Sequence, residues 1–225
     1  MLQVNMFVRG QSIMGRIALF VHHPKCSIQS GNGIAKALSS QFSVKIFTRH
    51  EVEDNFFDDV DMVVFPGGIG DADSWEYLMR ENGKRVRDFV AGGGRYLGVC
   101  MGAYWAAHHY FDLLQGVDAV QYIKRPAADI RRSYSTTAEV IWRGKPERMF
   151  FYDGCALVGD TAKFETIATY ANGDAMAIIQ DRIGLVGCHP ESDTYWYDRK
   201  YLEPHWHDYR HHQLLLDFAL ELMSK

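Results

Sequence analysis

The sequence predicts an α/β protein with a mostly parallel sheet flanked by helices and an antiparallel β block in its second half. From residue 16 onwards, short apolar or β-branched runs alternate with longer amphipathic segments, which is typical of βαβ units. In the second half the runs are strand-like only, and Asn172-Gly173 between two of them is a strong hairpin signal. The 225 residues, 47% of them hydrophobic, can bury one full core. We expect one domain over residues 14–225, preceded by a tail or vector-derived remnant over residues 1–13.

The first half predicts four strands and two long helices. Gly31 and Gly33 should weaken the first turns of the earlier helix. The third and fourth strands end in the segments PGG and GVC, at the edge where open α/β sheets keep their ligand sites. We therefore expect a flavodoxin-like arrangement. The expected strands are residues 16–21, 43–48, 61–68 and 96–100, and the expected helices are residues 27–40 and 73–94.

The second half predicts consecutive antiparallel strands followed by a helix. Apolar residues recur at helical spacing over residues 205–223, so this segment should pack back on the sheet. No internal repeat, low-complexity tract or linker suggests a second domain. The strand-like runs are residues 131–144, 149–159, 164–180 and 182–190.

Composition limits the partners and the compartment. The net charge of -4 is too small and too evenly spread to favour a nucleic acid or a membrane as partner, so we expect a small polar ligand. The four cysteines are widely spaced, which favours neither a zinc site nor a disulfide framework and suggests a reducing, cytoplasmic location. No run approaches the roughly 18 apolar residues of a membrane span. Nothing in the sequence calls for a metal or a cofactor.

Cys100 stands at a sharp strand-to-helix turn between Gly98 and Gly102. Such a turn exposes its side chain, which suits a nucleophile, and the helix beginning at Met101 favours the thiolate form. The Met101 N–H and an N–H of the Gly67-Gly68 turn are placed to stabilise an oxyanion. The alternative is a small buried cysteine at the end of a strand.

A base and its orienting acid follow another strand, in the segment GCHPE. His189 is the candidate general base, and Glu191 is the candidate group that holds the imidazole in the required tautomer. Pro190 between them fixes the backbone so that both side chains face one pocket. Together with Cys100 they would form a Cys-His-Glu triad acting on an amide through a thioester.

The three motifs PGG (66–68), GVCMG (98–102) and HPE (189–191) resemble, in that order, the class I glutamine amidotransferase-like superfamily. The resemblance implies that Cys100 is the nucleophile, His189 the base and Glu191 the third member of the triad. It also implies that the amides of Gly68 and Met101 are the oxyanion donors. The resemblance covers nearly the whole chain after residue 14. It also implies a synthetase or ligase as a partner protein.

Within that superfamily, the segments GGGRYLGVCMGAYWA and FFYDGC are most similar to the N-terminal domain of biotin-protein ligases and its stand-alone bacterial homologues. Glutamine-using members carry Gln four residues after the nucleophile, where this chain has Tyr104, so glutamine itself is in doubt as substrate. Gly67, Tyr104, Tyr152 and Asp153 are the candidate substrate-binding residues. The alternative function is a non-catalytic ligand-binding or regulatory module.

Three further signals carry weaker interpretations. A histidine-rich segment at residues 205–212 invites a metal site, but a solvated helix start is favoured over it. Cys26, in the loop after the first strand, is interpreted as a buried thiol, and Cys188 as a structural residue on the strand face opposite His189. The remaining aromatic residues near the motifs are either an acyl pocket or ordinary packing, and packing is favoured: Trp105, Tyr195 and Trp196.

Overall fold

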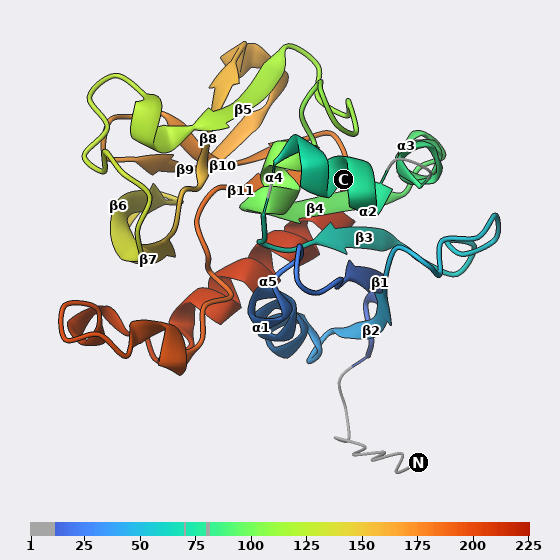
Figure 1. The fold of residues 1–225 in the computed structure, drawn as a ribbon, viewed down its shortest axis with the longest axis horizontal. Coiled ribbons are helices and arrows are strands. Elements are labelled where there is room, and N and C mark those ends of the chain that lie inside the picture. Colours follow the sequence, from blue (N-terminus) through green and yellow to red (C-terminus); the bar gives the residue numbers. More distant parts are fainter. Residues whose placement is uncertain (1–11, 70, 80–81) are drawn as a thin grey trace.

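The computed structural model describes residues 12–69, 71–79 and 82–225 (Figure 1). Residues 1–11, most of the expected tail, lie outside the described residues. The strands are β1 (Gly15–Phe20), β2 (Phe42–Phe47), β3 (Met62–Phe65), β4 (Arg95–Val99), β5 (Val117–Gln121), β6 (Thr136–Trp142), β7 (Lys145–Phe151), β8 (Cys155–Gly159), β9 (Glu165–Tyr170), β10 (Ala175–Gln180) and β11 (Ile183–Val186). The α-helices are α1 (Ile28–Leu38), α2 (Ala72–Met79), α3 (Gly83–Ala91), α4 (Met101–Trp105) and α5 (Arg210–Met223).

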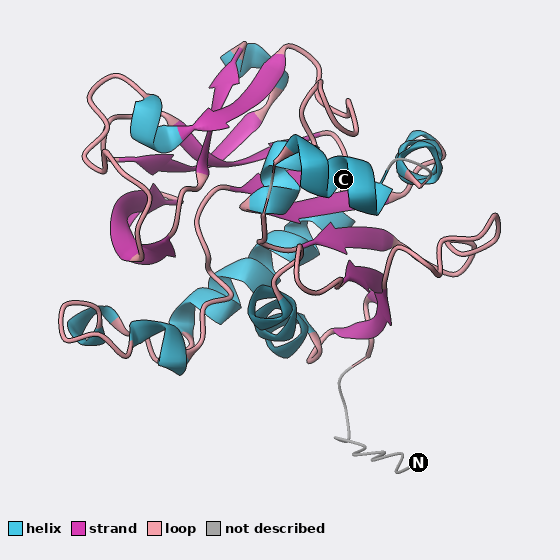
Figure 2. Cartoon of the chain, viewed as in Figure 1, coloured by secondary structure: helices cyan, strands magenta, loops and turns pink. Residues whose placement is uncertain are grey.

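The strands form one mixed sheet, in the order β2-β1-β3-β4-β11-β10-β9-β6-β7, with β8 paired to β10 and β5 paired to β8. The pairs from β2 to β11 are parallel and the pairs beyond β11 are antiparallel. This is the α/β fold expected from the sequence, with the antiparallel block in the second half. Figure 2 shows helices on both sides of the parallel part and strands predominating in the rest.

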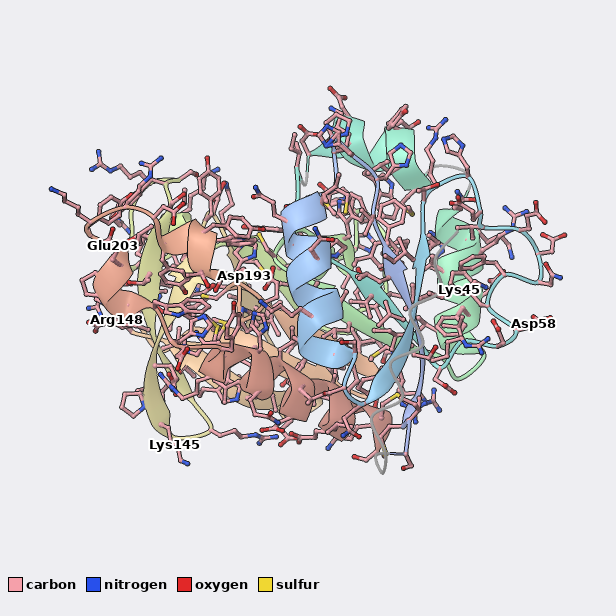
Figure 3. The ribbon with its side chains drawn as sticks, turned by 90° about the horizontal axis from the view of Figure 1, so that it is seen from below. Lys45, Asp58, Lys145, Arg148, Asp193 and Glu203 are labelled. Atoms are coloured by element: carbon pink, nitrogen blue, oxygen red, sulfur yellow. The ribbon has the colours of Figure 1, made fainter. Side chains whose placement is uncertain are left out.

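Alternate residues of the parallel strands face two separate cores, as the period of two in a strand requires. In β1, Leu19 belongs to the core beneath α1 and α5, whereas Phe20 belongs to the core beneath α2, α3 and α4. Most side chains of β1, β3, β4 and β11 are therefore buried on both faces, which accounts for their nearly continuous apolar sequences. Charged side chains lie at the periphery, with Asp58 at one end of the molecule and Lys145 at the other (Figure 3).

The helix expected over residues 73–94 is two helices, α2 and α3. Helix α3 begins after Asn82, whose side-chain amide donates a hydrogen bond to the Arg49 carbonyl oxygen at 2.7 Å. Asn and Gly have low helix propensity in a helix interior, and here they occupy the junction. Similarly, the strand expected over 149–159 is interrupted between β7 and β8, where Asp153 adopts a positive φ of 51°.

The carboxyl ends of β3, β4 and β11 meet at one edge of the parallel sheet. Strands β3 and β4 are neighbours, and so are β4 and β11. The PGG, GVC and HPE segments, which follow these strands, are thereby brought together from distant parts of the sequence. Among the described residues, no helix is long and apolar enough to cross a membrane.

Candidate active site

Cys100 occupies a strained turn between β4 and α4. Its φ is 49° and its ψ is -102°, a conformation that residues with a side chain rarely adopt. A Cβ on Gly98 would lie 2.4 Å from the Gly102 carbonyl oxygen, and one on Gly102 would lie 2.1 Å from that of Phe65. Both glycines are therefore required by the close approach of backbone segments around the cysteine. Cys100 itself is 6% exposed and lines two cavities.

His189 and Glu191 form a buried pair at the end of β11. The His189 Nδ1–H donates to Glu191 Oε1 at 2.8 Å, and the side chains are 7% and 0% exposed. Burial lowers the pKa of His189, but the Glu191 carboxylate and the nearby Cys100 outweigh it and raise the pKa to about 10. The imidazole is therefore positively charged at neutral pH. The structure thus brings the three residues of the expected triad together.

Ser30 is a member of this network that sequence reasoning missed. Its buried hydroxyl donates to Glu191 Oε1 at 2.6 Å and accepts from the Gly67 N–H at 2.8 Å. It therefore connects helix α1, the turn after β3 and the carboxylate after β11. The sequence holds only an indirect signal for it, Gly33 in the same helix, because a Cβ there would lie 2.2 Å from the Glu191 carbonyl oxygen. Gly33 thus lets the helix approach the site, whereas a Cβ on Gly31 would meet the Val21 side chain at 2.8 Å.

The hydrogen bond from Ser30 decides which amide of the glycine turn is available. The Gly67 N–H is engaged by Ser30. The bridge between this turn and Cys26 is made by Ser27 N and Ile69 N, so the Gly68 N–H has no hydrogen-bond partner within the described ranges. The same holds for the Met101 N–H. Gly68 and Met101, the two expected oxyanion donors, both line a cavity with Cys100.

Helix α4 is too short to act on Cys100 as the sequence suggested. It spans only residues 101–105, so its dipole adds little to the electrostatics of the thiol. The positive charge beside Cys100 comes instead from His189, which is held by Glu191.

Two cavities meet at Cys100, and both also include Gly68 and Tyr152. The first, of about 380 Å³, contains His189, Gly67 and aromatic side chains. The second, of about 510 Å³, contains the other two expected substrate-binding residues, Tyr104 and Asp153. The four candidate substrate-binding residues thus lie around Cys100, divided between its two sides.

In the second cavity, Tyr104 and Asp153 are held in place by hydrogen bonds. The Tyr104 hydroxyl donates to the Asp153 carbonyl oxygen at 3.1 Å, and burial raises the pKa of Tyr104 well above its ordinary value. The Asp153 carboxylate accepts from Gln121 Nε2 at 3.1 and 3.0 Å. Trp105, by contrast, is 0% exposed and belongs to the core, as the packing interpretation expects.

The histidine-rich segment is not the solvated helix start that the sequence suggested. His207, His211 and His212 are buried, and burial lowers the pKa of His207 to about 3 and that of His211 to about 4. His211 donates to Glu147 at 3.0 Å, and His212 donates to the carbonyl oxygens of the Glu191 segment. No group of three or more residues suited to hold a metal ion occurs in the part of the chain that the structure describes.

The other two cysteines near the motifs are buried, as expected. Cys26 is 0% exposed, its thiol donates to the Phe20 carbonyl oxygen, and burial raises its pKa to about 12. Cys188 is 0% exposed, and its thiol lies 3.8 Å from the Tyr170 hydroxyl, which is also buried.

Part of the chain matches a known protein family. Residues 23–117 match the family model described as biotin-protein ligase, N terminal. This range contains the glycine turn and Cys100 but ends before His189. Comparison with curated proteins finds no match.

Solved structures are similar over nearly the whole chain. A crystal structure of a glutamine amidotransferase shares 16% identity at a TM-score of 0.63, over 93% of this chain and 99% of its own. A glutamine amidotransferase from Thermotoga maritima shares 11% identity at a TM-score of 0.64, over 94% of this chain and 96% of its own. At these identities the likeness shows the fold. The expected similarity to the biotin-protein ligase N-terminal group is confirmed over residues 23–117, and the expected glutamine amidotransferase-like fold is confirmed over nearly the whole chain.

Proposed function

We propose that this chain, which has the fold of the glutamine amidotransferases, is a cysteine-dependent amide hydrolase or amidotransferase. Cys100 is the nucleophile, His189 is the acid and base, and Glu191 holds the imidazole. The amides of Gly68 and Met101 form the oxyanion hole. The observation that carries the proposal is the buried His189–Glu191 hydrogen bond of 2.8 Å beside a cysteine in a strained turn.

The first half of the reaction forms a thioester. The Cys100 thiolate attacks the carbonyl carbon of the amide, and the negative charge that develops on the oxygen is stabilised by the two free N–H groups. The His189 imidazolium then gives its Nε2 proton to the amide nitrogen as the carbon–nitrogen bond breaks. The amine leaves, and the acyl group remains on sulfur.

The second half regenerates the enzyme. Neutral His189 accepts a proton from water as the water oxygen attacks the thioester carbon, and the carbon–sulfur bond breaks to give a carboxylic acid and thiolate. Glu191 keeps Nδ1 protonated throughout, so that Nε2 faces the reacting atoms. Ser30 positions Glu191 through its 2.6 Å hydrogen bond.

The experiment is a comparison of amide hydrolysis by native protein and by Cys100→Ala, with ammonia or released amine as the readout over a panel that includes glutamine. The native protein should release product and Cys100→Ala should not. Cys26→Ala, which removes a buried thiol that lines neither cavity, is the matched control and should retain activity. Equal release by the native protein and by Cys100→Ala would remove the enzyme proposal.

The alternative is a non-catalytic binding or regulatory module. One observation favours it: Tyr104, with its hydroxyl engaged by the Asp153 carbonyl oxygen, occupies the place where glutamine-using members carry Gln. A module of this kind would bind amides or their acids in the cavities beside Cys100 without turnover. Saturable binding that is equal in native protein and Cys100→Ala, with no hydrolysis by either, would support it.

A further inference from the structure

We infer that the substrate is a secondary amide whose amine part carries an apolar or aromatic group, and that this group occupies the cavity beside His189. The inference rests on the proposed function, because it assigns the two cavities to the two halves of an amide cleaved at Cys100. Cleavage of a secondary amide releases an amine, which distinguishes this activity from that of an enzyme that releases ammonia. The acyl part then occupies the cavity beside Tyr104 and Asp153.

The assignment follows from the geometry of amide cleavage. The tetrahedral intermediate carries sulfur, the oxyanion, the acyl group and the departing nitrogen on one carbon. The departing nitrogen must lie within hydrogen-bond reach of the group that protonates it. His189 lines only the cavity of about 380 Å³, whereas Met101, an oxyanion donor, lines only the cavity of about 510 Å³. The amine therefore leaves on the His189 side.

Four aromatic side chains line the His189 cavity, together with three polar ones, Ser27, Gln29 and Ser135. The Trp196 ring packs against the His189 ring at a centroid distance of 5.3 Å, and Phe150 packs against Trp196 at 5.0 Å. Tyr195, 45% exposed, and Tyr152, 50% exposed, stand at the solvent side. The exposed tyrosines, the half-buried Trp196 and the buried Phe150 together form an aromatic part of the cavity with rings available for stacking.

Ammonia would leave this cavity almost empty. A small molecule of the size of water takes up about 30 Å³ of liquid volume, whereas the cavity measures about 380 Å³. Among the described residues, its lining includes no Asp, Glu, Lys or Arg, so apart from His189 these residues offer no charge to hold an ionic amine substituent. A benzyl-sized neutral group matches both the volume and the walls.

The opposite cavity has a different chemistry. Asp71 and Asp153 line it together with Gln121, Tyr104 and Tyr110. Two carboxylates disfavour an anionic acyl group and favour one that carries hydrogen-bond donors. The substrate is therefore asymmetric, with a polar acyl part and an apolar amine part.

The test compares amides that share one acyl group and differ in the amine. Alanine benzylamide and alaninamide are suitable, because benzylamine and ammonia have similar basicity and the comparison then reports binding rather than leaving-group reactivity. We expect kcat/KM to be at least tenfold higher for the benzylamide. Tyr195→Ala should lower the ratio of kcat/KM for the benzylamide to kcat/KM for alaninamide by about tenfold. Tyr77→Ala, a tyrosine of similar exposure away from both cavities, should change neither. Equal or faster cleavage of alaninamide would overturn the inference.

A binding readout separates this inference from the proposed function. Saturable protection of Cys100 from iodoacetamide by the benzylamide, but not by alaninamide, supports the apolar amine site even where neither compound is cleaved. Protection by the benzylamide without cleavage of either compound would refute the proposed hydrolase activity but still support the apolar amine site. Equal protection by both amides, or protection that Tyr195→Ala does not weaken, would refute the apolar amine site whatever the outcome of the hydrolysis assay.

Discussion

Glu191→Gln tests the electrostatic core of the site. Glutamine has nearly the same shape as glutamate and can still accept from Ser30, but it carries no charge. In the native structure burial lowers the pKa of His189, and Glu191, followed by Cys100, raises it to about 10. Removing the charge should therefore lower the pKa of His189.

The size of the effect follows from the contact that is lost. A hydrogen bond to a charged group contributes about 1.5–3 kcal/mol, and one pKa unit corresponds to about 1.4 kcal/mol. We therefore expect the pKa of His189 to fall by roughly one to two units. The assay is an NMR titration of the His189 ring, followed by the rate of Cys100 alkylation at neutral pH, which should also fall.

Glu147→Gln is the matched control, because Glu147 is a buried carboxylate that accepts from a different histidine, His211, at 3.0 Å. It should leave the titration of His189 and the alkylation of Cys100 unchanged. A titration midpoint of His189 that Glu191→Gln leaves unaltered or raises would refute the reasoning.

Two further predictions concern stability. Ser30→Ala removes a hydroxyl hydrogen-bonded to a buried carboxylate and to a backbone N–H, so urea unfolding should show a free energy of unfolding lower by about 2–3 kcal/mol. Ser27→Ala, which removes the cap of the same helix, should lower it by only about 1 kcal/mol. Equal losses would count against a special role for Ser30. His207 and His211 have folded-state pKa values of about 3 and about 4, below the ordinary 6.5. Because these pKa values are depressed, the contribution of the two histidines to the free energy of unfolding is present above pH 6.5 and is lost as the pH falls below it. The slope should be roughly 2–3 kcal/mol per pH unit near pH 5. Unfolding midpoints that are the same at pH 7.5 and pH 5 would contradict this.

The grouping of the proposed triad residues was accessible from the sequence because they follow the ends of apolar strands. Parallel strands carry whatever follows them to the same edge of the sheet, so the positions of Cys100 and His189 along the chain predict their proximity. The role of the turn glycines could also be predicted, since Gly98 and Gly102 flank a residue that needs an unusual backbone conformation.

Ser30 and the buried histidines were not accessible in the same way. The contact of Ser30 with Glu191 spans 161 positions and depends on how α1 packs against the loop after β11, which no spacing encodes. His207 and His211 read as polar residues at a helix start. Only the packing of the segment after β11, where the Tyr197 and Trp206 rings cover His207, makes them interior.

The most direct test of the account is to find where an acyl group is transferred. The protein is incubated briefly with p-nitrophenyl acetate at neutral pH, and the acetylated peptide is identified by mass spectrometry. We expect the acetyl group on Cys100 in the native protein and its loss in His189→Asn. Acetylation of another residue, or equal labelling of Cys100 in both proteins, would contradict the proposal that thiol, imidazole and carboxylate act as one catalytic unit.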